Sequence, residues 1–437
     1  PWVSGVENHN EVIPLDGGRF VHGDLAMDVG RNGEVAIAYT RNSTGPVDDG
    51  TRSLGLLYKW DDIWTEIILD NSTNTGYSPS LEIDRNGALH IAYIDRANGK
   101  LNYQTNATGS GWSNLTLGDA DGSLAGTNTA MVIHPTTNAI HIVATGNSNT
   151  NYLQHYSNES GSWINATISN LDYNEGTYPV IKMGCNGDLF VIYHNSTGND
   201  LMMSSRIDNN WQNETVKSYS SWGVGTNNDM AIDSTGTIQI TTWVYRTTKS
   251  ALMLYGTPGN WVEPAQGLFG PAYYPAIDVD SNDVVHAAYH VGLSPKYLKY
   301  FNNGGGSLPA ITSHTTLHTT AAGGIDMEID NNDDLFISHY TSNTVPRTMY
   351  LTTYQGTGQG LTVHPTFEVS PPLPDGLTMN WCDGTISGTP TLPYANTQHT
   401  VIVTAMGVTT TGTFTLEVIE APSITYPDAP FTFIKNT

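Results

Sequence analysis

The stretch Ser80-Leu81-Glu82-Ile83-Asp84, followed by the turn Arg85-Asn86-Gly87 and then by Leu89-His90-Ile91-Ala92-Tyr93, decides the fold. Two short apolar runs flank a turn, and this pattern occurs seven times along the chain. With Tyr93 as the anchor, the equivalent residues are Tyr39, Tyr93, Ala144, Tyr193, Thr242, Tyr289 and His339, at spacings of 54, 51, 49, 49, 47 and 50 residues. A period near 50 residues, built from short alternating strands, is typical of propeller blades. One blade cannot bury both of its faces alone, so the repeats predict a closed ring.

Each repeat carries four strand signals. In the second copy they lie at about 79–84, 88–94, 100–103 and from Trp112 onward. The tryptophan that opens the fourth strand recurs at positions 64, 112, 163, 211 and 261, which predicts packing between adjacent blades. The last repeat lacks a fourth strand, whereas an orphan strand lies at residues 11–15, before the first repeat. We expect this segment to complete the seventh blade; the alternative is that residues 1–20 form a linker.

Composition indicates an all-β protein with an acidic surface. The 437 residues include 17 Lys and Arg against 41 Asp and Glu, giving a net charge of −24, and only 13% of residues are charged. Abundant Gly, Thr, Asn, Ser and Tyr suit turns and strands rather than helices. The charge disfavours nucleic acid and anionic membranes as partners. Without a run of 18 apolar residues, no direct membrane insertion is expected.

Glycosylation signals suggest a compartment. The N-terminus, Pro1 to Ser4, does not resemble a signal peptide. Eight Asn-X-Ser/Thr sequons nevertheless lie in the first half of the chain, mostly in predicted loops or at strand ends, where a glycan can stand in solvent. They are Asn42, Asn71, Asn106, Asn114, Asn158, Asn165, Asn195 and Asn213. We therefore expect a protein that is secreted or displayed on the cell surface.

The two cysteines do not form a disulfide framework. Cys185 and Cys382 each lie at a turn. A bridge between them would connect the propeller to the C-terminal module. The sequence favours the other outcome, two unpaired thiols.

The repeats resemble those of secreted seven-bladed β-propellers of the sialidase-like, BNR-like type. The resemblance rests on Asp84 to Tyr93 with Lys100 to Tyr103, and on Asp280 to Tyr289 with Tyr297 to Tyr300, and it extends over roughly residues 20–355. It specifies architecture better than activity, because related propellers are binding modules, scaffolds and enzymes. The Ser-x-Asp-x-Gly-x-x-Trp box is absent and the chain has nine arginines in all, which argues against a sialidase.

Beyond residue 355 the period breaks and a second resemblance begins. Leu373-Pro374-Asp375-Gly376-Leu377, followed by Asp383 to Pro390, resembles the signature of Ig-like (cadherin-like) modules in large bacterial and archaeal surface proteins. The predicted organisation is a propeller over 1–355 and an Ig-like β-sandwich over 356–420. The last part, 421–437, is a linker or the first strand of a further module.

Candidate ligand-binding residues come from the loops that converge around the central channel. The loops entering the first strand of each blade offer His22, Tyr77, Tyr178, Trp222, Tyr273 and Tyr274. The loops after the second strand offer Arg41, Asp95, Arg96, His194, Tyr245, Arg246 and His290. Aromatic faces beside a few charged groups suit sugars, whose C–H faces stack while their hydroxyls form hydrogen bonds. The alternative is that most of these residues simply line the blade tops.

An enzymatic alternative stays open. Some polysaccharide lyases are seven-bladed propellers in which His and Tyr act as acid and base while Arg neutralises a uronate. His194, Tyr245, Arg246 and His290 would fill those roles. No convincing carboxylate pair for a hydrolase is apparent.

No cofactor is expected, although a bound Ca²⁺ is an alternative. Asp278, Asp280 and Asp283 have the oxygen-rich composition of a calcium loop, but they lack the EF-hand spacing and fall at a blade turn, where Asn and Asp are common for conformational reasons. His90, His141 and His286 recur at one strand position in different blades, which favours packing over a zinc cluster.

These observations favour a non-catalytic extracellular module for adhesion or binding, with a glycan or an extracellular protein as its partner. The first alternative is a polysaccharide lyase or another carbohydrate-active propeller enzyme. The second is an architectural subunit of a surface layer or filament, which would self-associate through the Ig-like module. A lyase needs a tight His/Tyr/Arg cluster in one cleft, whereas a binding protein can spread aromatic residues over several blades.

Overall fold

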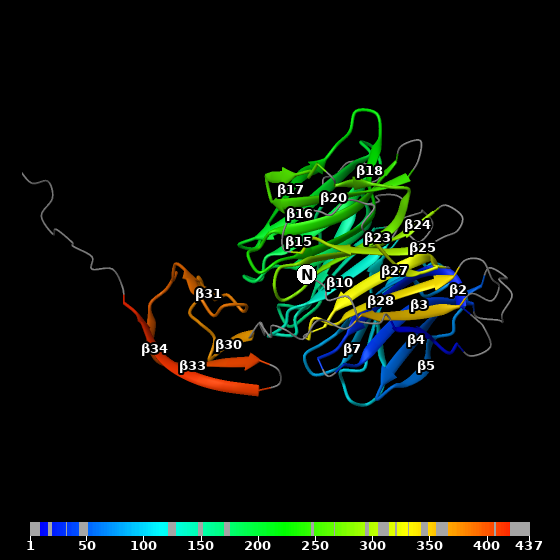
Figure 1. The fold of residues 1–437 in the computed structure, drawn as a ribbon. Coiled ribbons are helices and arrows are strands. Elements are labelled where there is room, and N and C mark those ends of the chain that lie inside the picture. Colours follow the sequence, from blue (N-terminus) through cyan, green and yellow to red (C-terminus); the bar gives the residue numbers. More distant parts are fainter. Residues whose placement is uncertain are drawn as a thin grey trace, which may run out of the picture. The chain divides into compact units, whose positions relative to one another are not determined.

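The computed structural model shows an all-β chain that divides into two compact units, residues 1–364 and 365–437 (Figure 1). It describes residues 9–15, 20–31, 33–42, 51–120, 128–146, 152–169, 175–245, 249–265, 267–292, 297–304, 314–319, 321–330, 332–341, 348–354, 366–405 and 408–419. Every regular element in these ranges is a strand. No described helix is long and apolar enough to span a membrane.

Seven antiparallel sheets make up the first unit over its described residues, and we number them as blades in chain order. Blade 1 contains β2 (Phe20–Val29), β3 (Val35–Asn42), β4 (Arg52–Trp60) and β5 (Ile63–Asp70). Blade 2 contains β6 (Tyr77–Ile83), β7 (Leu89–Asp95), β8 (Lys100–Thr105) and β9 (Ser113–Asp119). Blade 3 contains β10 (Thr129–Ile133), β11 (Ile140–Thr145), β12 (Leu153–Ser157) and β13 (Ile164–Thr167). Blade 4 contains β14 (Glu175–Met183), β15 (Leu189–Asn195), β16 (Asp200–Ile207) and β17 (Asn210–Lys217).

The remaining blades vary this plan slightly. Blade 5 contains β18 (Gly223–Ile232), β19 (Ile238–Tyr245), β20 (Lys249–Thr257), β21 (Asn260–Val262) and the short β22 (Leu268–Phe269). Blade 6 contains β23 (Ala272–Val279), β24 (Val285–Val291), β25 (Tyr297–Asn302) and β26 (Thr315–His318). Blade 7 contains β27 (Ala321–Ile329), β28 (Leu335–Thr341) and β29 (Met349–Tyr354), and takes its outer strand, β1 (His9–Val12), from the start of the chain.

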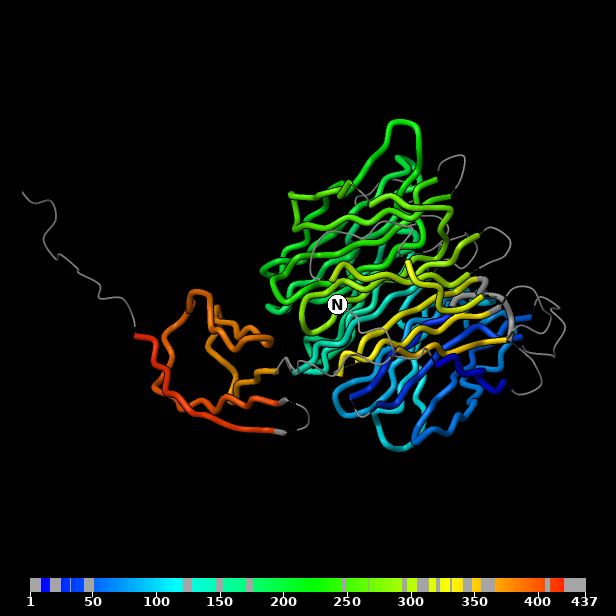
Figure 2. The backbone as a smooth tube through the Cα atoms, in the orientation of Figure 1, coloured from blue at the N-terminus to red at the C-terminus, as the bar shows by residue number. Residues whose placement is uncertain are grey.

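The first strands of the blades form a closed ring. Going around the ring, β2, β6, β10, β14, β18, β23 and β27 each contact the next, and β27 contacts β2. In Figure 2 the yellow strands from the end of this unit lie beside the blue strands from its start, as ring closure requires. The first unit is therefore a seven-bladed β-propeller with its first strands around a central channel, as the repeats predict.

The N-terminal strand fastens blade 7 to blade 1. β1 pairs antiparallel with β29, placing Glu11 opposite Leu351, and Ile13 is buried at 2% exposure. The Glu11 carboxylate accepts hydrogen bonds from Lys59 Nζ at 2.7 Å and from Trp64 Nε1 at 2.8 Å, both on blade 1. The prediction that this segment completes the seventh blade is confirmed.

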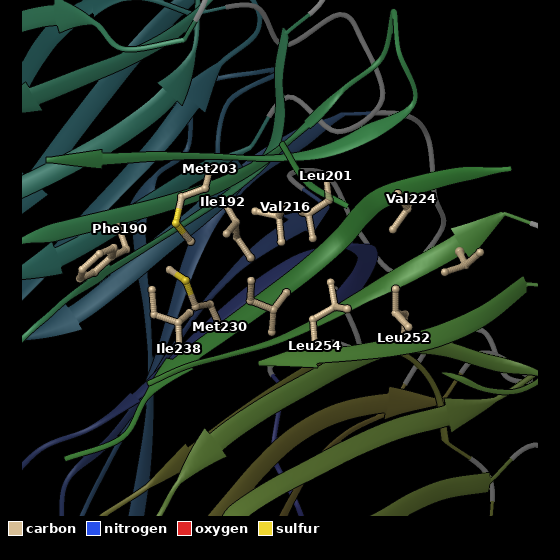
Figure 3. Packing of buried hydrophobic residues seen from close by; sticks show 12 residues of the cluster. Phe190, Ile192, Leu201, Met203, Val216, Val224, Met230, Ile238, Leu252 and Leu254 are labelled. Carbon is tan, nitrogen blue, oxygen red and sulfur yellow. The ribbon is translucent and has the colours of Figure 1, made fainter. Parts of the chain in front are cut away.

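Apolar side chains fill the spaces between blades. Between blades 4 and 5, Phe190, Ile192 and Met203 face Met230 and Leu254 in two opposed rows (Figure 3). The strand-opening tryptophans pack against the preceding blade: Trp163 contacts Tyr103, Trp211 contacts His155, and Trp261 Nε1 donates to Glu214 at 2.9 Å. The predicted role of these tryptophans in packing between blades is confirmed.

The second unit is an Ig-like module. Its larger sheet contains β30 (Thr366–Ser370), β33 (Tyr394–Ala405) and β34 (Val408–Val418), and its smaller sheet pairs β31 (Leu377–Met379) with β32 (Ile386–Gly388). His399 is buried and its Nδ1 lies 2.8 Å from the Pro371 carbonyl oxygen.

The cysteine prediction is wrong. Both Cys185 and Cys382 are disulfide-bonded, and no free cysteine exists in the described chain. Sequence position alone could not reveal this, because a disulfide depends on the separation of two Cα atoms that the chain order does not determine.

Candidate functional site at the mouth of the central channel

A cavity of about 290 Å³ lies in the central channel. Residues from the first strand of every blade line it, together with Tyr340 from β28. Because seven strands meet here, residues more than 200 positions apart in sequence face one another across the ring. The cavity is therefore the candidate ligand site, since small ligands commonly bind in pockets with a few convergent polar groups.

A β-bulge recurs where the first strand of a blade passes this cavity. The register shifts between Tyr77 and Ser80, Thr177 and Val180, Thr226 and Asp229, Tyr273 and Ala276, and Gly323 and Asp326. One residue in each bulge has a left-handed backbone, with φ of 47° at Ser78, 53° at Tyr178, 50° at Asn227, 48° at Tyr274 and 56° at Gly324. Bulges of this kind redirect a side chain out of the regular alternation.

The bulge is strained at two tyrosines. A bulky residue at positive φ is a genuine outlier, and both Tyr178 and Tyr274 also precede a proline, which further restricts their backbone. Backbone strain of this kind costs of order 1–3 kcal/mol and clusters at ligand sites. The fold thus holds two aromatic rings at the cavity at the expense of local strain.

Tyrosines and asparagines together form the mouth of the channel. Tyr178, Tyr274 and Tyr340 line the cavity, and all three sit near the start of a first strand or at the end of a second strand. Asn228 is fixed, since its Nδ2 donates to the Tyr178 carbonyl at 2.9 Å and its Oδ1 accepts from Thr242 Oγ1 at 2.7 Å. The Asn227 side chain, also on the lining, has no hydrogen bond to any described residue and is available to a ligand.

Carboxylates lie further along the same strands. Glu82, Asp229, Asp326 and Glu328 line the cavity, while Asp28 and Asp278 lie on neighbouring first strands. Four of them link adjacent blades by accepting the backbone N–H of the next strand. Asp28 binds Ile83 N at 2.6 Å, Asp229 binds Ile277 N at 2.8 Å, Asp278 binds Ile329 N at 2.9 Å, and Asp326 binds Met27 N at 2.7 Å.

One ammonium group, on Lys182, faces these carboxylates from β14. Burial alone would lower the pKa of Lys182, but the charges of Glu328, Asp278, Asp229 and Glu82 outweigh it and raise the pKa above its ordinary value. Burial raises the pKa of Asp229 to about 7 and that of Asp28 to about 6, even though backbone donors and Lys182 lower both. The side chains of Asp28 and Asp229 are surrounded by protein, so loss of hydration is the largest cause of their raised pKa values.

Glu82 gives a prediction about stability. Burial, and next the charge of Asp28, raise its pKa well above the ordinary 4.5, and it has no hydrogen bond to a described residue. Burial of the ionised Glu82 therefore destabilises the folded state. The loss of stability is complete at pH values above the raised pKa and absent at pH values below the unfolded-state pKa of 4.5. Glu82→Gln should raise the melting temperature at pH 8 by roughly 2 °C, with the gain shrinking towards pH 5.

Thermal unfolding at the two pH values measures this effect. Glu263→Gln is the matched control, because Glu263 forms a surface ion pair with Lys217 at 2.6 Å and its loss should give no gain at pH 8. A lower melting temperature for Glu82→Gln at pH 8 would show that its charge is stabilising.

The structure brings only part of the predicted ligand-binding set to the cavity. Tyr178 and Tyr274 line it, and Tyr273 lies beside it, with its ring 5.4 Å from Trp243. The Arg96 guanidinium stacks on Tyr77 at 3.8 Å, outside the cavity lining. Trp222 is 39% exposed on blade 5. His22 lies on β2, but its side chain is not among those described.

The residues of the lyase alternative do not form one cluster among the described residues. His194 is buried on blade 4 against Tyr178, with ring centroids 6.4 Å apart, whereas His290 is buried on blade 6 against Tyr273 at 6.3 Å. Tyr245 is 60% exposed on blade 5. Arg246 lies outside the described residues.

The candidate calcium ligands have protein partners. Asp280 Oδ1 accepts the N–H groups of Asn282 and Val284, as expected for turn chemistry, and Asp283 accepts from Ser234 of blade 5. Asp278 accepts from Val279 and Ile329. No group of three potential ligands positioned for a metal occurs among the described residues. Calcium binding stays an untested prediction.

The repeated histidines pack as predicted. His90 Nδ1 lies 2.6 Å from Tyr103 Oη, and His286 Nδ1 lies 2.8 Å from Tyr300 Oη, each within its own blade. Of the sequon asparagines, Asn71, Asn114, Asn165 and Asn213 are exposed, and Asn106, Asn158 and Asn195 are half-buried. Asn42 is fully buried and cannot carry a glycan in the folded chain.

Sequence reasoning missed Asn227, Asn228, Tyr340, Lys182 and the channel carboxylates other than Asp278, which it considered only as a calcium ligand. A signal exists for Lys182 and for four of the carboxylates. When the first strands are aligned by the repeat, one position contains Asp28, Glu82, Val132, Lys182, Ala231, Asp278 and Glu328. Charged residues at an inward position of a buried strand would have indicated the polar channel.

Comparisons with known proteins agree with the fold. The family described as "Putative Ig domain" matches residues 332–419, a range that also covers β28 and β29 of blade 7. No curated protein sequence matches the chain. Solved propeller structures also resemble this chain. Their sequence identity to it is low, so the likeness shows the fold alone.

Three of these structures illustrate the range of the fold. A BP39L lectin from Burkholderia pseudomallei matches with a TM-score of 0.54 at 12% identity, over 77% of this chain and 98% of the lectin. The polysaccharide lyase Uly1 matches with 0.52 at 11%, over 81% and 94%. A protein of unknown function from Dyadobacter fermentans matches with 0.51 at 12%, over 81% and 100%.

Proposed function

We propose that the propeller is a non-catalytic carbohydrate-binding module that holds a sugar at the mouth of its central channel. The observation that carries the proposal is the pair of tyrosines, Tyr178 and Tyr274, kept in a strained backbone conformation on the lining of the cavity. Aromatic faces stack on the C–H face of a sugar ring, and the Asn227 amide offers both a donor and an acceptor to its hydroxyls. The fold, which it shares with a lectin among other proteins, is compatible with this role.

The charge of the channel argues for binding rather than for lyase chemistry on a uronate. A lyase must neutralise the carboxylate of its substrate, whereas the described lining contributes four carboxylates and one lysine. The two histidines of the lyase alternative also lie on different blades. The binding experiment therefore includes an assay that would detect polysaccharide lyase activity.

Secretion or cell-surface display, in a propeller of the BNR-like type, belongs to the same proposal. The disulfide-bonded state of Cys185 and Cys382 supports an oxidising compartment, as do the exposed sequons. Self-association through the Ig-like module and binding of an extracellular protein stay predictions.

Tyr274→Ala tests the proposal. A glycan array identifies the tightest neutral oligosaccharide, and titration calorimetry then measures its affinity for the full chain. We expect the substitution to weaken binding about tenfold or more, because a buried aromatic anchor typically contributes that much.

Tyr255→Ala is the matched control, since Tyr255 is 40% exposed on β20 and does not line the cavity. It should bind like the unmodified chain. Equal affinity of the Tyr274→Ala variant would move the binding site elsewhere. New absorbance from an unsaturated uronate product, in an assay on acidic polysaccharides, would favour the lyase.

A further inference from the structure

A lysine framed by aromatic rings lies on the same face of the propeller, beside the channel mouth. The ring centroids of Trp243, Tyr245 and Tyr273 lie 4.4, 5.4 and 5.7 Å from Lys249 Nζ. Trp243 and Tyr245 are at the end of β19, Lys249 begins β20, and Tyr273 belongs to β23 of the next blade. We refer to these four residues as the lysine–aromatic cluster.

The charge of Lys249 is not neutralised by the protein. Neither a hydrogen bond nor an ion pair connects it to a described residue, although aromatic faces attract the ammonium and hold it in place. Lys59 and Lys217, by contrast, have anionic partners: Lys59 binds Glu11 at 2.7 Å and Lys217 binds Glu263 at 2.6 Å. Lys299 has no carboxylate partner either, but its ammonium donates to the His314 carbonyl oxygen at 3.3 Å. In a chain of net charge −24, an ammonium without a carboxylate partner needs a reason.

The lysine–aromatic cluster is continuous with the candidate sugar site. The Trp243 ring lies 5.3 Å from that of Tyr274, which lines the cavity. On the other side, the 60% exposed Tyr245 pairs with Gly223, the residue next to the exposed Trp222. Aromatic rings therefore lead from the cavity, through the buried Trp243 and past Lys249, to the exposed Tyr245.

Tyr273 owes its position to a neighbouring glycine. A Cβ at residue 292 would overlap the Tyr273 ring, so Gly292 allows the ring to lie directly on the backbone. The Tyr273 ring also stands perpendicular to that of Trp243, at an interplanar angle of 90°. This packing fixes the frame around Lys249 before any ligand arrives.

We propose that the lysine–aromatic cluster is an outer subsite for the carboxylate or sulfate group of an acidic sugar, whose neighbouring sugar unit occupies the channel mouth. This inference rests on the proposed carbohydrate-binding function. The ammonium supplies up to three donors to the anion, and the exposed Tyr245 supplies a face for the sugar ring. Four carboxyl groups and a single lysine line the described cavity, so an anionic group is better placed beside the ammonium of Lys249 than inside the cavity.

Matched ligands test the subsite. The neutral oligosaccharide that binds tightest on the array is compared with its uronate form and its 6-sulfated form, each titrated into the full chain at low and at high salt. We expect at least one acidic form to bind more tightly than the neutral form at low salt. Lys249→Met should weaken the acidic form about tenfold and leave the neutral form unchanged.

Two further variants make the result specific. Lys249→Arg retains the charge and should preserve the preference for the acidic form. Lys217→Met removes a lysine that also lies over a tyrosine, 4.7 Å from Tyr219, but whose charge is already paired with Glu263, so it should leave both affinities unchanged. The uronate and sulfate arms identify which anion the subsite takes.

The outcomes separate this inference from the proposed function. If the neutral form binds as tightly as both acidic forms, or if Lys249→Met leaves their ratio unchanged, the subsite is refuted while carbohydrate binding stands. If no sugar on the array binds, the carbohydrate-binding function fails and the subsite fails with it.

Discussion

Replacing Lys182 by methionine is expected to destabilise the propeller by about 3–5 kcal/mol at pH 8, because it removes the ammonium that faces the buried carboxylates of the channel. Without it, Glu82, Glu328, Asp229 and Asp278 repel one another inside a ring that holds them in place. The hydrogen bonds that Asp229 and Asp278 accept from adjacent strands cannot relax without separating the blades.

The effect of Lys182→Met should depend on pH in a defined direction. Burial already raises the pKa of Asp229 to about 7 and of Asp326 to about 6, and loss of the lysine raises both further. When the folded state raises the pKa of a carboxyl group, the protein loses stability as the pH rises from the group's unfolded-state pKa through its folded-state pKa. The destabilisation should therefore be largest at pH 8 and smaller at pH 5.

Urea unfolding at both pH values measures it. Lys100→Met is the control, since Lys100 and Asp119 form an exposed pair whose loss should cost less than about 1 kcal/mol at either pH. Equal destabilisation by Lys182→Met at pH 8 and pH 5 would mean that packing, not charge, accounts for the role of this residue.

Deleting residues 1–15 is expected to cost at least about 4 kcal/mol and to make the chain prone to aggregation. The deletion removes the buried Ile13, whose truncation to alanine alone would cost about 2–5 kcal/mol. It also removes the bonds from Lys59 and Trp64 to Glu11, and it exposes the edge of β29. An unpaired strand edge is a template for association with another chain.

Thermal unfolding and light scattering of the shortened chain test this expectation. Glu11→Gln is the control, because it weakens the ion pair with Lys59 but keeps the strand, and should lower stability by no more than about 1 kcal/mol. A shortened chain that melts with the full chain and stays monomeric would show that β1 does not close the ring.

The architecture was predictable because it rests on local patterns. The anchor residues, from Tyr39 to His339, all lie on second strands, and the orphan strand pairs with β29 as its sequence suggests. The repeated tryptophans revealed the packing between blades, since one side chain type at a fixed position of every repeat marks a shared environment.

The site was only partly predictable. Tyr178 and Tyr274 stand out as aromatic residues before a strand, but their left-handed backbone in a bulge is not encoded by residue type, since tyrosine disfavours it. Lys182 is one of seven equivalent positions, and its role appears only when ring closure brings β14 opposite β23 and β27. The rings around Lys249 come from two neighbouring blades, and the sequence does not specify that they surround its ammonium group.

We propose that a sugar occupies the channel mouth. A crystal structure of the full chain with the tightest oligosaccharide from the array tests it most directly. We predict density for a sugar ring against Tyr274 and within hydrogen-bond distance of the Asn227 amide. A sugar bound on the outer strands of the blades or on the Ig-like module, with the cavity free of sugar, would contradict the account.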